Sequence, residues 1–279
     1  MAISRADALV AVERSPAASG ARDRDRWIDA FTFDAHVEDP VGSRPHRGHT
    51  AIARFYDTFI GPRDIAFDRD VDIVVGSTVI RDLNLRVRMG SGVTMRIPAY
   101  LRYDVADDLG ELKIAALYAF WELPAMVAQF LGSGPRAVAP GLQLSKGLLL
   151  NQGLIGALGF LSGFRGPGHQ GKRRFGEFLS DARAGDEVAL RRRLGKGARI
   201  TFGDDVAMGG TELLSRLAGA RQRKLIAAGH HLVVGIERDG HRDVLMAEVS
   251  TRPFAVNRIR YFSDAGEVVR PPFEHDRDG

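Results

Sequence analysis

Leu83-Asn84-Leu85-Arg86-Val87-Arg88-Met89 decides the fold of the first half of this 279-residue chain. Apolar and polar side chains alternate along it, which is the two-residue period of a strand with one buried face. The alternation returns over 97–103 after a Gly90-Ser91-Gly92 turn, and 114–122 has the pattern of a last strand. An antiparallel sheet is therefore expected across 65–121.

Helices are expected before this sheet. Across 3–34 apolar residues recur at helical spacing, with a break near Ser15-Pro16 and Gly20. A second short helix is expected over 50–59, and Asp39-Pro40-Val41-Gly42 forms a turn between the two. Helices followed by a curved antiparallel sheet are typical of an α+β domain.

Two more regions follow the sheet. Residues 131–171 are rich in glycine and proline and hold one apolar segment, 148–164, so we expect a linker that carries an apolar helix. Residues 172–279 then repeat the order of elements expected in residues 1–130. The chain is therefore predicted to be a tandem duplication, with two related domains on either side of the linker.

The composition is that of a soluble globular protein, with 44% hydrophobic and 27% charged residues. There are no cysteines, which excludes disulfides and thiolate metal ligands. The net charge is +4, but the arginines around 22–29 alternate with aspartates, as on a solvated helix face, so no nucleic-acid partner is expected. No run reaches the roughly 18 apolar residues of a membrane span. We expect no stable membrane span and a cytoplasmic location.

The stretch Val37-Glu38-Asp39-Pro40-Val41-Gly42-Ser43, with Gly48, Ile52 and the pair Phe55-Tyr56 after it, resembles the bacterial steroid Δ-isomerase family. The resemblance covers roughly residues 3–125. It implies the cone-shaped α+β fold that this family shares with nuclear transport factor 2 and the polyketide cyclases. It also implies that Asp39 is a general base that moves a proton beside a steroid ketone, and that Tyr56 is its polar partner.

Such chemistry needs a carboxylate in an apolar cavity, where the carboxylate accepts a proton without competition from water. Strand parity and the resemblance together give the expected substrate-binding residues, which are Leu85, Val87, Met89, Ala99, Leu117, Ala119 and Trp121. The expected partner is a small hydrophobic molecule, either a steroid or a polyketide-like compound. No dinucleotide fingerprint, phosphate loop or metal-binding histidine pair occurs, so no cofactor and no metal are expected.

The sequence departs from the family pattern at the two donors of the oxyanion hole. Ketosteroid isomerase uses a tyrosine and a protonated aspartate there, whereas alignment places Ser15 or Pro16 at one position and Ala99 at the other. Losing one such donor costs about 10²–10³ in rate. Two functions therefore stay open. One is a steroid Δ-isomerase-like or polyketide-cyclase-like enzyme with Asp39 as base, and the other is a non-catalytic protein that binds a small hydrophobic molecule.

The second domain lacks the motif. Phe202 stands where the first domain has Asp39, and Asn257 falls opposite Ala99. We therefore expect a degenerate, non-catalytic copy. Isomerase-like domains dimerise through the outer face of the sheet, so the resemblance implies that this copy is a built-in partner in an intramolecular pseudo-dimer, with a homodimer as the alternative.

Overall fold

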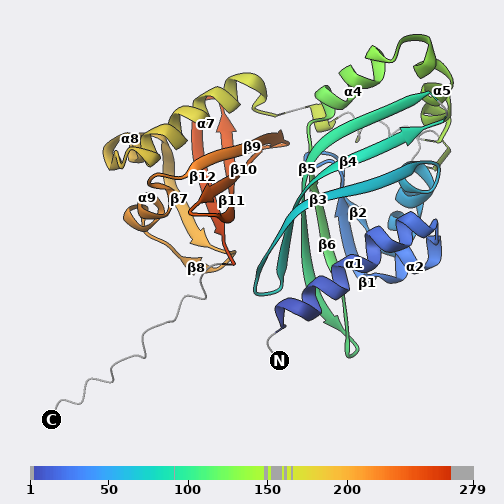
Figure 1. Cartoon of the computed structure of the whole chain (residues 1–279), viewed down its shortest axis with the longest axis horizontal. Coiled ribbons are helices and arrows are strands. Elements are labelled where there is room, and N and C mark those ends of the chain that lie inside the picture. Colours follow the sequence, from blue (N-terminus) through green and yellow to red (C-terminus); the bar gives the residue numbers. More distant parts are fainter. Residues whose placement is uncertain are drawn as a thin grey trace.

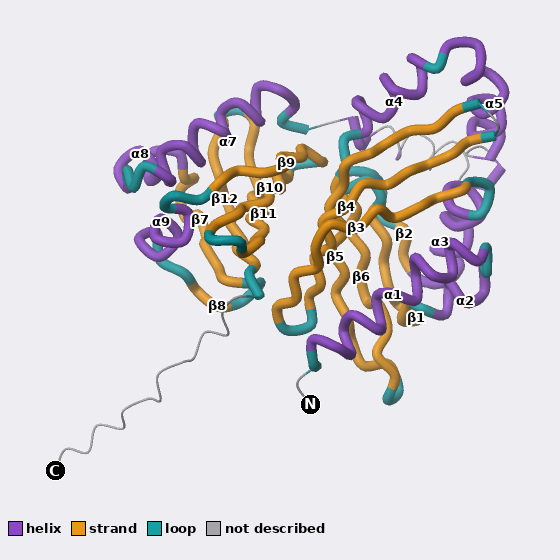
Figure 2. The backbone as a smooth tube through the Cα atoms, viewed as in Figure 1, coloured by secondary structure: helices purple, strands orange, loops and turns teal. Residues whose placement is uncertain are grey.

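The computed structural model describes residues 3–90, 92–147, 150–151, 159, 162–164 and 166–264. These residues form two domains of the same architecture, each with helices packed against one face of a six-stranded sheet (Figure 1, Figure 2). The strand order is β2-β1-β6-β5-β4-β3 in the first sheet and β8-β7-β12-β11-β10-β9 in the second. Since these two orders are equivalent position by position, the predicted α+β class and tandem duplication are confirmed.

The first domain opens with helices α1 (Arg5–Ala21) and α2 (Arg24–Asp29). The predicted break at Ser15-Pro16 is wrong, because α1 continues through Pro16 and buries a face of small side chains against the sheet. The prediction of helix up to residue 34 is also wrong. Strand β1 (Phe31–Glu38) begins at Phe31 and pairs in parallel with β6. Burial alternates along the second half of β1, as expected for a strand with one buried face.

The remaining elements of the first domain include the predicted helix and the predicted long strands, together with the short strand β2, which the sequence analysis does not predict. A short helix lies between two small elements and is followed by four long strands, namely β2 (His46–Arg47), α3 (Gly48–Phe55), η1 (Tyr56–Ile60), β3 (Asp64–Val75), β4 (Thr78–Met89), β5 (Val93–Asp108) and β6 (Glu111–Phe120). In β4 the alternation holds from Leu83 to Met89, but residues 78–83 are buried on both faces. The second domain covers the outer face there.

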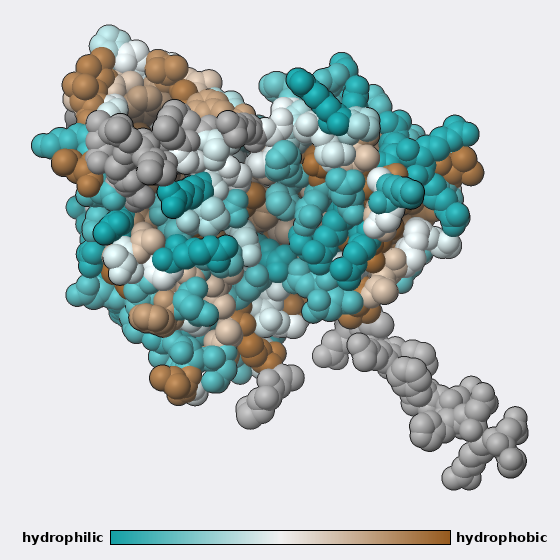
Figure 3. Space-filling model, turned by 180° about the vertical axis from the view of Figure 1, so that it is seen from behind, coloured by the Kyte–Doolittle hydropathy of each residue, from teal (hydrophilic) through white to brown (hydrophobic). Residues whose placement is uncertain are grey.

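The segment predicted as a linker begins with structure that belongs to the first domain. Helix α4 (Leu123–Gly132), the turn η2 (Gly134–Ala137) and helix α5 (Val138–Gly147) lie at one end of the first sheet and pack onto its core (Figure 1). Their outer side exposes Leu131, Val138 and Leu142, and apolar residues gather at this end of the molecule in Figure 3.

The apolar helix predicted over 148–164 falls largely outside the described residues. Its last three residues form the short turn η4 (Ser162–Phe164). In the part of the chain that the structure describes, every helix is too short or too polar to cross a membrane.

The second domain repeats this plan on a smaller scale. Two helices precede its first strand, a third helix follows the short second strand, and four longer strands complete the sheet. The elements are α7 (Gly168–Arg183), α8 (Glu187–Arg193), β7 (Leu194–Phe202), β8 (Val206–Ala207), α9 (Gly210–Leu217), β9 (Arg221–Ala228), β10 (His231–Arg238), β11 (His241–Thr251) and β12 (Phe254–Phe262). The predicted strands over 231–238 and 244–251 are thus present.

The two sheets pack against each other through their outer faces (Figure 1). Apolar side chains of both sheets form one buried cluster there, with Ile80 and Tyr100 on one side and Val233 and Met246 on the other. Polar contacts surround this cluster.

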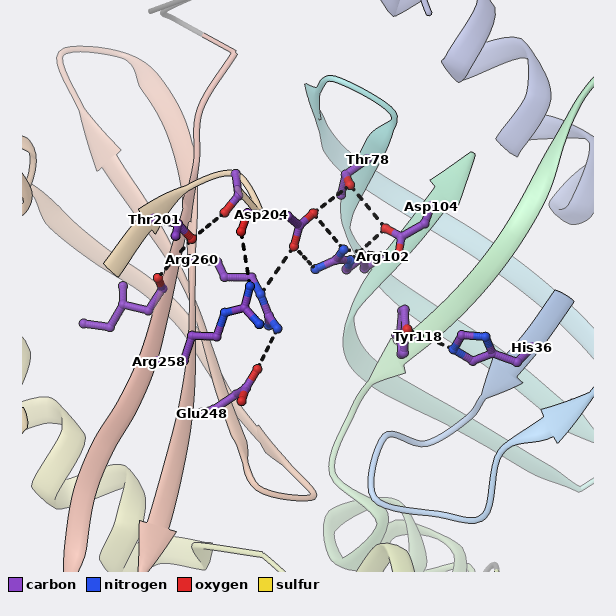
Figure 4. A network of polar contacts seen from close by, with 12 residues as sticks. His36, Thr78, Arg102, Asp104, Tyr118, Thr201, Asp204, Glu248, Arg258 and Arg260 are labelled. Atoms are coloured by element: carbon purple, nitrogen blue, oxygen red, sulfur yellow. Dashed lines mark hydrogen bonds and ion pairs between the residues drawn. The ribbon is translucent and has the colours of Figure 1, made fainter. Parts of the chain in front are cut away.

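Two basic residues lie at the centre of those polar contacts. Arg102 bonds Asp204 of the second domain at 2.8–2.9 Å (Figure 4). Lys224 bonds Asp82 at 2.6 Å and the carbonyls of Leu83 and Ala99 at 2.8 Å. The cation of Lys224 thus ties the second domain to two strands of the first.

Candidate functional site

An apolar cavity of about 1180 Å³, counting its open mouth, lies inside the first domain. The sheet forms one wall with the side chains of β4, β5 and β6, and the helices α1, α2 and α3 with η1 form the opposite wall. Helices α4 and α5 add Met126, Val127, Phe130 and Leu144 at the end of the sheet. A concave, mostly apolar site with a few polar groups is the usual form of a small-molecule pocket.

The structure places most of the expected substrate-binding residues in this wall. Leu85, Val87, Met89, Leu117 and Trp121 line the cavity. Ala99 and Ala119 lie in the same core but are fully buried and are not part of the lining, because their methyl groups are too short to reach past larger neighbours.

The sequence analysis does not predict the aromatic residues of the helical wall or the lining residues of α4 and α5. Trp27, Phe55 and Phe59 come from the helical side, and their helical spacing was the available signal. Phe130 and Leu144 come from α4 and α5, which gave no signal because glycine and proline indicated a linker there.

Asp39 reaches this cavity from the residue directly after β1. The parallel pairing of β1 with β6 sets Glu38 beside Tyr118, so the chain ends of the two strands lie together. The indole Nε1 of Trp121, just after β6, donates a hydrogen bond of 2.6 Å to the Asp39 carboxylate. The Asp39-Pro40 peptide bond is cis.

The surroundings of Asp39 shift its proton affinity. Asp39 is partly exposed and belongs to the lining of the cavity. Burial among apolar groups raises the pKa of Asp39 from 3.8 to about 6, and the hydrogen bond from Trp121 opposes this rise. A carboxyl group with a pKa of about 6 is present in both protonation states near neutral pH, which suits a general base that must also return its proton.

Tyr56 lies elsewhere. Its buried ring packs against Trp27 with centroids 5.3 Å apart, and Tyr56 is not among the residues that line the cavity. Burial raises its pKa. The structure therefore assigns Tyr56 to the core beneath the cavity wall.

Tyr103 is a tyrosine of the cavity wall that the sequence analysis passed over. It comes from β5 and is 1% exposed. Burial raises the pKa of Tyr103. The charge of Arg81 opposes this rise, and the charges of Asp72, Glu13 and, least of all, Asp39 add to it. Strand parity was the available signal, since Tyr103 shares a strand face with Ala99. A protonated phenol therefore faces the cavity within the electrostatic reach of Asp39.

Ser15 of α1 also lines the cavity. This is one of the two residues that alignment places at the family's oxyanion tyrosine. The shorter serine side chain leaves the hydroxyl in the helix wall.

In the second domain the position of Asp39 is closed. Phe202 is 6% exposed and belongs to an apolar core with Phe175 and Phe178. The guanidinium of Arg216 lies over its ring, 5.1 Å from the centroid. Asn257, opposite Ala99, is exposed. No group of three or more His, Asp or Glu residues that could hold a metal ion occurs among the described residues of either domain.

Comparison with known proteins agrees with this architecture. Residues 12–113 match the family model of the SnoaL-like domain. A Δ5-3-ketosteroid isomerase from Mycobacterium sp. is 26% identical over 43% of this chain and 96% of its own, with a TM-score of 0.40. A LEH-like epoxide hydrolase from M. tuberculosis is 19% identical over 48% of this chain and 97% of its own (TM-score 0.41).

A SnoaL-like polyketide cyclase from Shewanella putrefaciens, given as putative, is 16% identical over 45% of this chain and 96% of its own, with a TM-score of 0.40. Each of these proteins is thus matched over nearly its whole length by less than half of this chain. The similarity to these proteins thus lies in the first half of the chain, where residues 12–113 match the SnoaL-like domain model.

Proposed function

We propose that the first domain is a proton-transfer enzyme of the steroid Δ-isomerase type, which acts on a hydrophobic ketone with Asp39 as general base. The observation that carries this proposal is a single carboxylate at the wall of an apolar cavity, with its pKa raised to about 6. An isolated carboxylate among apolar side chains costs folding free energy. A group of that kind at a cavity wall is a candidate for chemistry.

The reaction that fits this site is a shift of a double bond. Asp39 takes a proton from the carbon between the ketone and the double bond, and the electron pair moves onto the ketone oxygen to give a dienolate. The carboxylic acid then returns the proton two carbons further along, and the electrons move back. Atoms and charge balance within the substrate, so no co-reactant is needed.

Trp121 positions the base in this scheme. Its indole holds one carboxylate oxygen at 2.6 Å, which leaves the other oxygen for the substrate. Because the hydrogen bond favours the charged form, it also keeps the pKa of Asp39 from rising further.

Tyr103 is the donor that we assign to the dienolate oxygen. Tyr103 lines the same cavity, and its raised pKa keeps the proton on the phenol. Such a donor stabilises the charge that develops on the oxygen. Ser15, in the opposite wall, offers a second hydroxyl.

A non-catalytic protein that binds a small hydrophobic molecule is the second candidate. The observation that favours it is Ala99, a side chain without a donor at the position of the family's acidic oxyanion residue.

The test is conversion of a Δ5-3-ketosteroid to its conjugated Δ4 isomer, followed by ultraviolet absorbance in the wild type and in Asp39→Asn. Quenching of Trp27 and Trp121 fluorescence measures steroid binding in parallel. The proposal expects turnover in the wild type and its loss in the variant, with binding retained. Binding without turnover in the wild type would establish the binding protein instead.

A further inference from the structure

The cavity has a second charged residue. Among the described residues of its lining, Asp39 and Arg63 are the two that carry charge. Arg63 stands between η1 and β3, in a turn where its backbone N–H bonds the carbonyl of Ile60. Its side chain is partly exposed and borders the cavity beside Phe59 and Ile65.

Arg63 has no carboxylate partner in the part of the chain that the structure describes. Its guanidinium bonds the backbone carbonyl of Thr58 at 2.5 Å and lies over the ring of Phe59, 5.8 Å from the centroid. Burial lowers the pKa of Arg63 to about 10, so the side chain stays charged at neutral pH. A cation that is largely removed from water and lacks a counter-ion is costly, and an anion at the cavity would offset that cost.

The neighbouring arginines behave differently. Arg22 and Arg88 both pair with Asp64, and Arg86 pairs with Asp68. These three arginines and Arg63 line a hollow beside the cavity mouth, and the acidic residue in the lining of that hollow is Asp64.

A second hollow beside Arg63 has two further charged lining residues. They are Asp57, which is already paired with Arg24, and Lys146. The charged residues that share these two hollows with Arg63 are mostly cations, namely Arg22, Arg86, Arg88 and Lys146 against Asp57 and Asp64, so the mouth attracts an anion.

Arg63 and Asp39 lie at opposite ends of the cavity. The pairing of β3 with β4 and of β4 with β5 sets Arg63 level with the start of β5, near Thr94. The pairing of β5 with β6 sets Trp121, the partner of Asp39, level with the region of Tyr100. Those two levels are six residues apart on one strand, a separation of roughly 20 Å between backbone positions. A long flat ligand could therefore meet both side chains.

We propose that Arg63 binds a carboxylate at the far end of the ligand whose ketone lies at Asp39. The natural ligand would then be an amphipathic acid, with an apolar body in the cavity and its anion at the mouth. A guanidinium can donate one hydrogen bond to each oxygen of a carboxylate, and this paired contact sets the orientation of the ligand as well as its affinity. This inference rests on the proposed function, because it takes the ketone to lie at Asp39.

The experiment compares two 3-ketosteroids that differ at the end away from the ketone. One is testosterone, and the other is testosterone 17-hemisuccinate, which carries a carboxylate there. Kd is measured by quenching of tryptophan fluorescence in the wild type, in Arg63→Gln and in Arg86→Gln. The control Arg86 lines the neighbouring hollow but is about half exposed, with 51% of its side chain accessible, and is already paired with Asp68.

We expect the wild type to bind the hemisuccinate about tenfold more tightly than testosterone, as a charge-assisted hydrogen bond provides. Arg63→Gln should abolish this preference and leave the Kd of testosterone within about threefold, whereas Arg86→Gln should keep the preference. Equal affinities of the wild type for testosterone and its hemisuccinate would overturn the inference, and this comparison needs no variant. A preference that survives in Arg63→Gln would overturn it as well. If neither steroid binds, the proposed function and the inference both fail. If both steroids bind with equal affinity, only the inference about Arg63 fails.

Discussion

The two domains share one strand order and differ in what fills their interior. In the first domain the sheet and helices enclose a cavity with Asp39 and Trp121 at its wall. In the second domain the equivalent position belongs to Phe202, which packs into an apolar core with Phe175 and Phe178. The comparison teaches that the scaffold is present twice while the candidate chemistry is present once, as expected where function lies in a site placed on a fold.

The second domain has a different task in this account. Its sheet covers the outer face of the first sheet, and Lys224 bonds Asp82 and the carbonyl oxygens of two strands of the first domain. Those strands, β4 and β5, carry the cavity wall on their other face. The second domain thus packs against the face of the first sheet that lies opposite the cavity.

The largest expected effect on turnover is at Asp39, and it is compared with a change at Phe202, the equivalent position in the second domain. Asp39→Asn should lower the rate of Δ5-3-ketosteroid isomerisation about 10³-fold, since a general base contributes about 10²–10⁴. Phe202→Leu, the matched change in the second domain, should leave that rate within about twofold, since it touches no group of the cavity. Turnover assays of the two variants side by side test this. Equal losses in both would show that the two domains act together in catalysis.

A smaller loss is expected at Tyr103. Tyr103→Phe keeps the ring and removes only the hydroxyl, so it should lower kcat about 10²-fold with little change in steroid binding. Tyr56→Phe is the control, because that ring lies outside the cavity lining. An unchanged kcat in Tyr103→Phe would move the donor role to Ser15.

The free energy of unfolding of the first domain should depend on pH, because the charged carboxylate of Asp39 is buried among apolar groups. The pKa of this carboxyl is about 6 in the folded chain against an ordinary value of 3.8. The folded state therefore binds its proton more tightly than the unfolded state, and wild-type stability falls as pH rises from about 4 to about 6. That shift corresponds to about 3 kcal/mol. We expect Asp39→Asn to be more stable than the wild type by up to this amount at pH 8 and equal to it at pH 4.

Denaturant titrations of both proteins at the two pH values measure this difference. Phe202→Leu is again the matched control, because it should destabilise by a similar amount at both pH values. A difference between Asp39→Asn and the wild type that does not depend on pH would mean that Asp39 is not held in an apolar environment.

Much of this difference between the two domains is predictable from the sequence, because the residues that decide it stand in a local pattern that indicates their environment. Leu85, Val87 and Met89 alternate with exposed arginines, so their side of the sheet is identifiable. Phe202 in place of Asp39 is visible by alignment of the two halves. In these places local pattern and tertiary structure agree.

Other features depend on contacts that one stretch of sequence does not contain. Phe31 continues the helical spacing of Trp27 and Ile28, yet it begins a strand because β6 lies beside it. Helices α4 and α5 contain glycine and proline, and packing on the cavity holds them in place. Arg63 follows no sequence pattern, because its interest lies in a guanidinium that forms no ion pair with a carboxylate in the described structure.

The central claim is that Asp39 of the first domain is the base, and the pH dependence of kcat/KM for the wild type tests it most directly. The charged carboxylate is the active form, so kcat/KM should rise with pH and reach half its maximum at about pH 6. In Trp121→Phe, which lacks the indole donor, the midpoint should move to higher pH because the charged form loses its hydrogen bond. A rate that does not change between pH 4 and pH 8, or a midpoint near 4, would contradict the account.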